Sequence, residues 1–153
     1  MSLISTGYDA LLSRLDALFP PTDGWNRLPN PYKPEENSEL FLTQGYGIAM
    51  GPGNNTNRQV NCKFSVVRQM TVVLTRKYEA LENDADAKAS TEKQLFEDQY
   101  ILINDLEQDI SINGQTMYTR FVADGGIEYV RSDTDRFLIL RTQYDLEYLE
   151  TFT

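Results

Sequence analysis

Few residues of this 153-residue chain could carry out chemistry. There is no histidine, so the commonest general base near neutral pH and the commonest metal ligand are both missing. This excludes Ser-His-Asp and Cys-His catalysis and leaves only pairs of carboxylates as an acid and a base. Because the chain has 23 Asp and Glu residues, such pairs occur on every surface and indicate no particular site. We therefore expect that the protein is not an enzyme.

Two further segments have partial similarity to ligand-binding motifs. The glycines from Gly45 to Gly51 lack the spacing of a dinucleotide fingerprint, and no phosphate-binding loop with Gly-Lys-Ser/Thr is present. We expect these glycines to make a strand irregular or bulged. The run Asp84–Lys88 has Lys88 where a calcium loop needs an oxygen ligand, and it lacks the required glycine. Acids near a helix N-terminus explain this run better, so we predict no metal and no cofactor.

The composition is that of one ordinary globular domain. Hydrophobic residues make up 41% and charged residues 24% of the chain, and the length suits a single domain over residues 1–153. Cys62 is the only cysteine, so it cannot form an intramolecular disulfide. Its neighbours Val60 and Phe64 favour a buried thiol that fills the core, which fits a reducing cytoplasm.

The charge balance bears on the class of partner. With 14 Lys and Arg against 23 Asp and Glu, the net charge is −9, and no basic cluster is present. Tight DNA binding is disfavoured, because displaced phosphate counterions supply much of that affinity. An acidic surface that DNA passes without specific binding is compatible with this charge. No apolar run approaches the ~20 residues of a membrane span, and the N-terminus does not resemble a secretory signal, so we expect no membrane partner.

The N-terminal third of the chain predicts a helix followed by an arm. Apolar residues from Leu3 to Phe19 recur at spacings of three and four, and Pro20 and Pro21 end this helix. Residues 20–38 form a Pro-rich arm or loop, which is long for a structureless connection. This arm contains Trp25 and Tyr32, which either fold back onto the core or contact a partner.

The middle of the chain predicts strands. We expect a glycine-containing strand over 39–50 and a flexible turn or loop over Gly51–Asn57. From Val60 to Tyr78 apolar residues occupy the even positions, interrupted only by Arg68 and Arg76. This alternation is far longer than a usual strand. It predicts a strand that bends around the core or projects as a ribbon, or a hairpin turn at Arg68-Gln69.

The rest of the chain predicts a helix and three strands. The helix spans about Ser90–Ile110 and should cover the even positions of the long strand. Strands follow over Thr116–Ala123, Ile127–Arg131 and Arg136–Glu150, with the first turn at Asp124-Gly125-Gly126. This order predicts the α+β class, with a mainly antiparallel β-sheet flanked by two helices on one side.

With no catalytic or ligand-binding motif, the remaining candidates for function are surfaces that bind other proteins. Long strands with exposed edges and a Pro-rich arm recruit partners by strand addition. The candidate subunit or partner contacts are Trp25, Tyr32, Arg68 and Arg76. The sequence thus predicts a non-enzymatic assembly subunit.

The C-terminal segment Asp135–Glu150, DRFLILRTQYDLEYLE, resembles the closing strand of tail-terminator proteins of long-tailed bacteriophages, also called tail-completion or head–tail joining proteins. The similarity extends in order and length to an N-terminal helix, a loop into a first strand, a long strand near Phe64–Tyr78, a middle helix and a final hairpin. It covers nearly the whole chain as a pattern of apolar alternation. This family has no catalytic residues to carry over.

The resemblance implies a structural virion subunit at the head-proximal end of the tail, assembled in the host cytoplasm. Six copies form a ring that seats on the last ring of the tail tube protein, stops polymerisation and offers a face to the head connector or head-completion protein. DNA passes through the ring without specific binding. Six copies of a −9 chain would carry −54, which repels a polyanion.

Three other functions remain open from the sequence. A different head–tail adaptor, such as a head-completion or minor tail protein, would share this size and acidity. A monomeric non-viral binding domain and an enzyme that uses carboxylates alone are the other two. Mass in solution separates a ring from a monomer, and gene neighbourhood separates a terminator from other adaptors.

Overall fold

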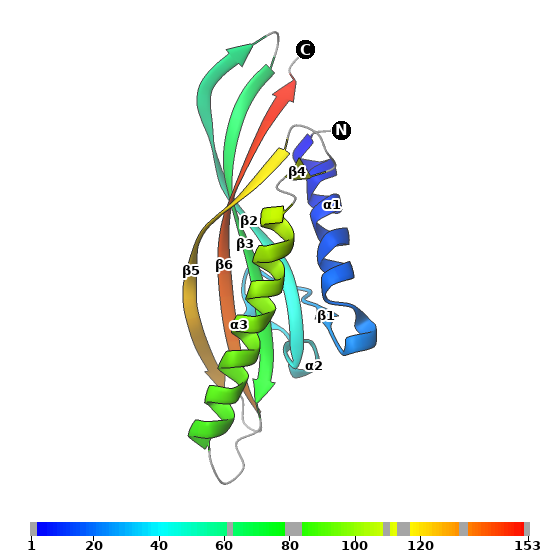
Figure 1. Cartoon of the computed structure of the whole chain (residues 1–153), viewed down its shortest axis with the longest axis vertical. Coiled ribbons are helices and arrows are strands. Elements are labelled where there is room, and N and C mark those ends of the chain that lie inside the picture. The colour runs from blue at the N-terminus through cyan, green and yellow to red at the C-terminus, as the bar shows by residue number, and fades with distance from the viewer. Residues whose placement is uncertain are drawn as a thin grey trace.

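A six-stranded sheet in the order β1-β2-β3-β6-β5-β4 forms the centre of the described part of the chain (Figure 1). This computed structural model describes residues 3–60, 63–78, 84–108, 111–112, 117–131 and 135–151. The helical elements are α1 (Leu3–Leu18), η1 (Pro21–Asp23), η2 (Pro34–Glu36), α2 (Glu39–Leu42) and α3 (Asp84–Gln108). The strands are β1 (Asn26–Arg27), β2 (Gln44–Val60), β3 (Lys63–Tyr78), β4 (Ser111–Ile112), β5 (Met117–Arg131) and β6 (Arg136–Thr151).

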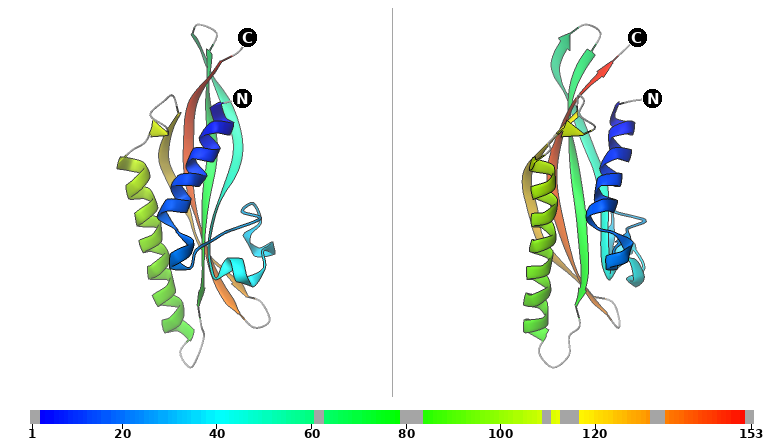
Figure 2. Two further views of the ribbon diagram at one scale, coloured as in Figure 1. Left: turned by 90° about the vertical axis from the view of Figure 1, so that its right-hand side faces the viewer. Right: turned by 45° about the vertical axis from the view of Figure 1, so that its right-hand side comes forward.

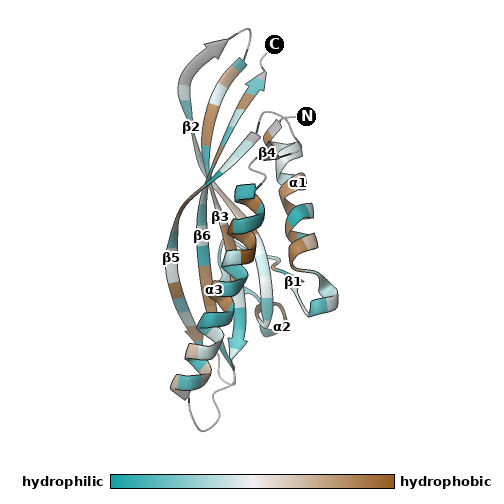
Figure 3. Ribbon diagram, viewed as in Figure 1, coloured by the Kyte–Doolittle hydropathy of each residue, from teal (hydrophilic) through white to brown (hydrophobic). Residues whose placement is uncertain are grey.

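The sheet is mostly antiparallel, since only the short β1–β2 pairing is parallel. Its centre is the β3–β6 pair, which runs without a register shift from Lys63 opposite Thr151 to Tyr78 opposite Arg136. Unbroken pairing keeps successive side chains on opposite faces, and this is why apolar alternation is so long in both strands (Figure 3). The predicted α+β class with a mainly antiparallel sheet is confirmed.

One face of the sheet carries the main core. Even-numbered side chains of β3 and β6, including Val72, Leu74 and Leu140, pack there against α1 and α3. Leu11 and Leu15 represent α1 in this core. Phe19, which directly follows α1, and Leu95, Leu102 and Leu106 of α3 belong to the same core. The predicted side of the long strand is therefore buried as expected, and two helices cover it together (Figure 2).

The opposite face carries a smaller core under the Pro-rich arm. Val73 of β3 and Ile139 of β6 pack there with Leu28 of the arm and Leu42 of α2. The arm is thus a cover for the second face of the sheet. The prediction that the helices lie on one side of the sheet is confirmed for α1 and α3. It is wrong for the short α2, which lies on the opposite face.

Gly45 and Gly47 allow the arm to lie directly on the sheet. A Cβ added at Gly47 would lie 2.8 Å from the Cβ of Pro31, and one added at Gly45 would lie 2.5 Å from the carbonyl oxygen of Phe41. Both glycines pair in regular register with β3. The expected role in strand irregularity is therefore wrong for Gly45 and Gly47, because close approach of backbone and arm is what requires them. It is confirmed for Gly51, which lies in the register shift between Met50 and Gly53.

The start of the first predicted strand is helical instead. Residues 39–42 form α2, with the amide of Leu42 donating to the carbonyl of Ser38 at 3.3 Å. The carbonyl of Leu42 accepts from the hydroxyl of Thr75 at 3.0 Å. Burial of Leu42 in the smaller core outweighs the strand-like pattern, so β2 begins only at Gln44.

Two predicted turns lie inside continuous strands. The Gly51–Asn57 segment belongs to β2, which absorbs it by register shifts between Met50 and Gly53 and between Asn55 and Gln59. Likewise, Asp124–Gly126 is a shift within β5, where Gly126 has a φ of +77° and its amide donates to the Asp124 carboxylate at 3.0 Å. Turn-forming residues also form β-bulges, and sequence alone does not separate the two.

The hairpin turn considered at Arg68-Gln69 is absent, because Arg68 pairs with Leu146 in an unbroken β3. Among the other boundaries, α1 ends before Pro20 as predicted, and α3 begins six residues earlier than expected, at Asp84. Asp84 and Asp86 lie in its first turn, as expected for acids at a helix N-terminus. Cys62, Ile110 and the 132–134 turn lie outside the described residues.

The far ends of β2, β3 and β6 extend beyond both long helices as a three-stranded ribbon (Figure 1). We call this the ribbon and define it by the described residues Gly53–Val60, Lys63–Val67 and Glu147–Thr151. Its base still meets the rest of the molecule, because Val66 and Tyr148 belong to the main core and Glu150 accepts from the amide of Ile4 in α1 at 3.1 Å. A long strand that projects as a ribbon was one of the predicted outcomes.

Candidate functional site

The four predicted contact residues fall into two groups in the structure. Trp25, Arg68 and Arg76 lie inside the molecule or against its backbone, and Tyr32 lies on the surface.

Trp25 is a core residue, with 5% of its surface exposed. Its ring centroid lies 4.6 Å from that of Phe19 and 6.4 Å from that of Tyr46. The guanidinium carbon of Arg76 lies 5.0 Å from the centre of the Trp25 ring, close enough for a cation–π interaction. The structure therefore brings Trp25 and Arg76 together.

Arg76 also forms a two-pronged ion pair with Asp98 of α3. Its Nε donates to Asp98 Oδ2 at 2.6 Å, and a terminal nitrogen donates to Oδ1 at 3.0 Å. Planar guanidinium and carboxylate groups match in this geometry. Arg76 thus interrupts the apolar alternation of β3 because it ties the arm, the sheet and α3 together.

Arg68 stabilises the first irregularity of β2. Its Nη1 donates to the carbonyl oxygen of Gly51 at 2.9 Å, and its Nε donates to the hydroxyl of Tyr148 at 3.1 Å. A β-bulge leaves backbone groups without ladder partners, and Arg68 supplies one. A Cβ on Gly53 would lie 2.9 Å from the Arg68 guanidinium, so this glycine leaves the space that Arg68 fills.

Tyr32 is 61% exposed at the surface of the arm. The arm around it is held by Asn37, whose amide nitrogen donates to the carbonyls of Asn30 at 2.8 Å and Pro34 at 2.9 Å. Asn37 Oδ1 in turn accepts from the Asn30 amide at 2.8 Å. Tyr32 is therefore presented on a braced loop. The sequence shows Asn37 as a turn-favouring residue after prolines, but this residue type alone does not predict which groups it contacts.

A second anchor of the arm crosses to the far strands. Arg141 of β6 pairs with Glu128 of β5 and lies 3.8 Å from Glu35 of η2.

On the other side of the sheet, Asp16 of α1 accepts from the Tyr46 hydroxyl and from Arg27. Burial and the Asp16 carboxylate raise the pKa of Tyr46, and the hydrogen bond to Asp16 raises the pKa of Arg27.

Sequence reasoning missed the outer face of α3. Phe96, Tyr100 and Ile101 are 47%, 64% and 45% exposed there. Phe96 and Tyr100, four residues apart, share one face of the helix, and the exposed Ile101 and Glu97 directly follow them in the sequence. We call these four residues the α3 patch. Single exposed apolar residues are ordinary, but several together mark an interaction surface.

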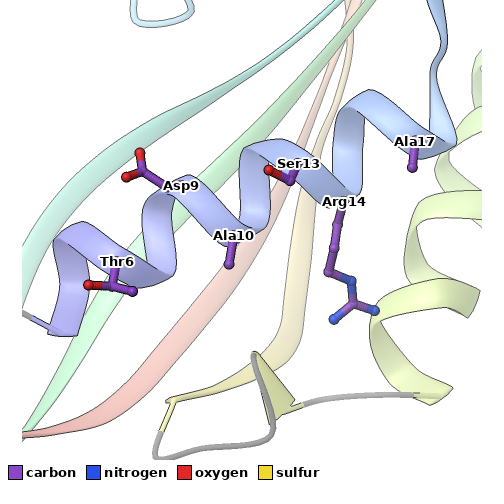
Figure 4. Close-up of a pocket in the computed structure, with 6 residues that line it drawn as sticks. All are labelled: Thr6, Asp9, Ala10, Ser13, Arg14 and Ala17. Carbon is purple, nitrogen blue, oxygen red and sulfur yellow. The ribbon is translucent and has the colours of Figure 1, made fainter.

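Two hollows lie on the described surface. One of about 530 Å³ runs along α1 and is lined by Thr6, Asp9, Ala10, Ser13, Arg14 and Ala17 (Figure 4). Arg14 spans from it to α3, donating to Asp105 Oδ2 at 2.7 Å. The other, of about 360 Å³, has three acids among its lining residues, which are Val67, Glu107, Tyr118, Thr119, Arg120, Asp145 and Glu147.

The described side chains offer no metal centre, because no three His, Cys, Asp or Glu residues among them are grouped to hold an ion. Across the same part of the chain, no helix has the length and apolarity to cross a membrane. The candidate contact surfaces of the described residues are the ribbon, the arm around Tyr32 and the α3 patch.

Comparison with known proteins adds no relative. No protein-family model matches the sequence, and no curated protein matches it significantly.

Proposed function

We propose that this chain is a structural virion subunit that forms a ring at the end of a bacteriophage tail tube and joins the tube to the head connector. The observation that carries the proposal is the ribbon, which extends beyond the helices that cover the sheet (Figure 2). The ribbon is exposed from Gly53 to Thr56 on β2 and at Leu149 on β6, and it is suited to reach a neighbouring copy.

The element order supports the same proposal. An N-terminal helix, a loop into β2, the long β3, the middle helix α3 and the β5–β6 hairpin follow one another as the resemblance to tail terminators requires. In this proposal, the partners are further copies of the chain, the tail tube protein and the head connector or head-completion protein, and the location is the head-proximal end of the tail.

The charge is suited to a ring around a DNA path. A net charge of −9 per copy repels a polyanion, so DNA would pass without binding. The same charge makes copies repel one another. High salt shortens the Debye length from about 10 Å at 0.1 M to about 3 Å at 1 M, and we expect it to favour the oligomer.

The test has two arms. Sedimentation velocity across protein concentration and salt should show a shift from monomer toward a closed oligomer, and electron microscopy should show overlong or headless tails when the gene is deleted. A chain that remains monomeric throughout, together with deletion tails of normal length that still join heads, would exclude the proposal.

A further inference from the structure

The sheet has two long edge strands that the described part of the chain covers at one end only. β1 pairs with β2 at Gly45 and Tyr46, and β4 pairs with β5 at Met117 and Tyr118. β2 and β5 lie on opposite sides of the β3–β6 pair (Figure 1), and no other described strand lies outside them. Most of each edge strand is therefore without a neighbouring strand in this part of the chain.

Register shifts and local contacts narrow each edge to one regular run. On β2, pairing with β3 is regular up to Met50 and shifts beyond it, so the uncovered run is Gly47–Met50, which we call the β2 edge. On β5, the amide of Phe121 donates to the Glu107 carboxylate of α3 at 3.2 Å, and register shifts follow as far as Ile127. The regular run that remains, Ile127–Arg131, is the β5 edge.

One hydrogen bond shows which backbone groups of the β2 edge point out of the sheet. The carbonyl of Tyr46 accepts from the amide of Leu28 in the arm at 2.8 Å, so Tyr46 directs its backbone groups away from β3. Successive residues of an antiparallel strand direct their N–H and C=O groups to alternate sides. Ile48 and Met50, two and four residues further along the regular run, therefore point outward as well.

The outward amide of Phe121 sets the alternation on β5 in the same way. Phe121 lies opposite an even-numbered residue of β6, Tyr144, and β6 pairs with β3 without a register shift. Residues of β5 that lie opposite even-numbered residues of β6 therefore direct their N–H and C=O groups outward. Ile127 and Tyr129 hold such positions.

The two edges lack the usual guards against pairing with another strand. Neither run contains a lysine or a proline, and residues 44–57 of β2 contain no charged side chain at all. The charges of Glu128 and Arg131 on the β5 edge cancel, and Tyr129 between them is 42% exposed. A regular edge of this composition is a template for a further strand.

The directions of the strands indicate a second copy as the partner. Along β2, β3, β6 and β5, each strand is antiparallel to the next, so β2 and β5 run in opposite directions. A rotation that keeps the strand direction therefore brings the β5 edge of one copy antiparallel to the β2 edge of the next. This single contact covers both edges of every copy, whereas pairing between two β5 edges would leave the β2 edges open.

We infer that the β5 edge of one copy pairs with the β2 edge of the next copy and continues the sheet from subunit to subunit. The outward groups of Ile127 and Tyr129 exchange hydrogen bonds with those of Ile48 and Met50. The contact is heterologous, and it generates a ring without open edges when the rotation between copies closes. This inference rests on the proposed ring function and names the two surfaces that join its subunits.

The first experiment is hydrogen exchange followed by mass spectrometry, which compares the wild-type monomer with the assembled oligomer. Peptides that contain Ile48 and Met50, or Ile127 and Tyr129, should exchange at least about tenfold more slowly in the oligomer, because new hydrogen bonds protect their outward amides. The peptide around Tyr32 in the arm is the internal control and should exchange at the same rate in both states.

Proline variants test the same amides one at a time. Met50→Pro and Tyr129→Pro each remove one outward N–H, which an edge strand tolerates. Each should weaken self-association in sedimentation velocity about tenfold relative to Met50→Ala and Tyr129→Ala, because the partner carbonyl loses its donor. The alanine variants are matched controls, since they remove the same side chains and keep the amide. Circular dichroism checks the fold, and where a proline variant does not fold, the exchange measurement on the wild type decides.

The outcomes separate this inference from the proposed function. If the wild type assembles while both edge peptides exchange as fast as in the monomer, the edge pairing is wrong and the ring stands. Folded proline variants that associate as tightly as their alanine controls also exclude the pairing. Protection of the β5 edge alone, or only after tail tubes are added, would contradict it too, because a different surface then covers that edge. A wild type that never self-associates, alone or on tail tubes, overturns both.

Discussion

The guanidinium of Arg76 lies between the ring of Trp25 and the carboxylate of Asp98, so one side chain of β3 joins the arm to α3. The two side chains of the ion pair are 20% and 8% exposed. An ion pair this protected is screened little by solvent, and the loss of one partner leaves a charge in a poorly hydrated place.

We predict that Arg76→Leu and Asp98→Leu each lower the free energy of unfolding by about 2–4 kcal/mol. The double variant Arg76→Leu/Asp98→Leu should recover much of this loss, since no unpaired charge remains. Urea denaturation provides the measurement. Arg120→Ala is the control, because the Arg120 side chain is 79% exposed and its pairing with Asp145 should contribute less than about 1 kcal/mol. Additive losses in the double variant would show that the two side chains are not coupled.

The main core gives a second prediction. Val72 is 1% exposed under the helices, and Val72→Asp should unfold the domain because burial of an unpaired carboxylate costs several kcal/mol. Gln143→Asp, on the opposite and exposed face of neighbouring β6, adds the same carboxylate and should melt like the wild type. Thermal melting followed by circular dichroism distinguishes them. A Val72→Asp protein with wild-type melting would refute the assignment of this face to the core.

The glycines under the arm, Gly45 and Gly47, give a third prediction. Gly47→Ala places a methyl group 2.8 Å from Pro31, and Gly45→Ala places one 2.5 Å from a backbone oxygen. We expect losses of about 1–3 kcal/mol in urea denaturation, as for other overpacked sites. The larger loss should occur at Gly45, where backbone cannot move aside easily. Gly125→Ala is the matched control, since its nearest neighbour would be 3.8 Å away. Equal stability of all three variants would mean that the arm does not press on the sheet.

Tyr144 gives a fourth prediction, on alkaline pH. Its hydroxyl is buried and has no hydrogen-bond partner among the described residues, and burial, with the negative charges of Glu107 and Asp105, raises its pKa above the usual value of 10.0. The folded state therefore keeps this proton more tightly than the unfolded state. Ionisation of Tyr144 therefore favours the unfolded state, so this group leaves the free energy of unfolding unchanged below pH 10 and lowers it as the pH rises above 10.

Tyr144→Phe should reduce this alkaline loss and should raise stability near pH 7 by about 1 kcal/mol, because it removes an unsatisfied buried hydroxyl. Tyr32→Phe, on the exposed arm, should change neither quantity. The measurement is urea denaturation from pH 7 to 11. A Tyr144→Phe protein with an unchanged pH profile and lower stability would indicate that the hydroxyl does have a partner.

A fifth prediction concerns metals. The chain has no histidine, and its described part has no metal-binding group of side chains. Elemental analysis of the purified protein should find no stoichiometric transition metal. One equivalent of zinc, retained after dialysis against a chelator, would contradict the expectation that the protein binds no metal.

The sequence was sufficient to predict the strands and helices that follow from the periodic spacing of apolar residues. Alternation in β3 and β6 identified the buried face, and spacings of three and four identified α1 and α3. The sequence did not separate a bulge from a turn at Gly51–Asn57 or at Asp124–Gly126, because the same small and polar residues serve both. Only the partner strands, distant in the sequence, decide between them.

The contact residues were predicted less well for a related reason. Arg68 and Arg76 interrupt an apolar pattern. An arginine at such a position contacts either another protein or a polar group within its own chain. Their internal partners, Gly51 and Asp98, lie 17 and 22 residues away and carry no sequence signal of the contact. Phe96 and Tyr100 lie at the margin of a helical apolar face, where small differences in helix orientation determine exposure.

The central position of the β3–β6 pair has a consequence for folding on the ribosome. After β3 emerges, the whole of α3 and β5 must be synthesised before β6 can occupy the adjacent edge. Pairing of such distant segments carries a large loop-closure cost and is slow. During that interval β3 has only β2 as a paired strand, and its apolar face lacks the cover of α3 until that helix has been synthesised. The nascent chain therefore passes through a period in which premature association with other nascent chains competes with correct folding.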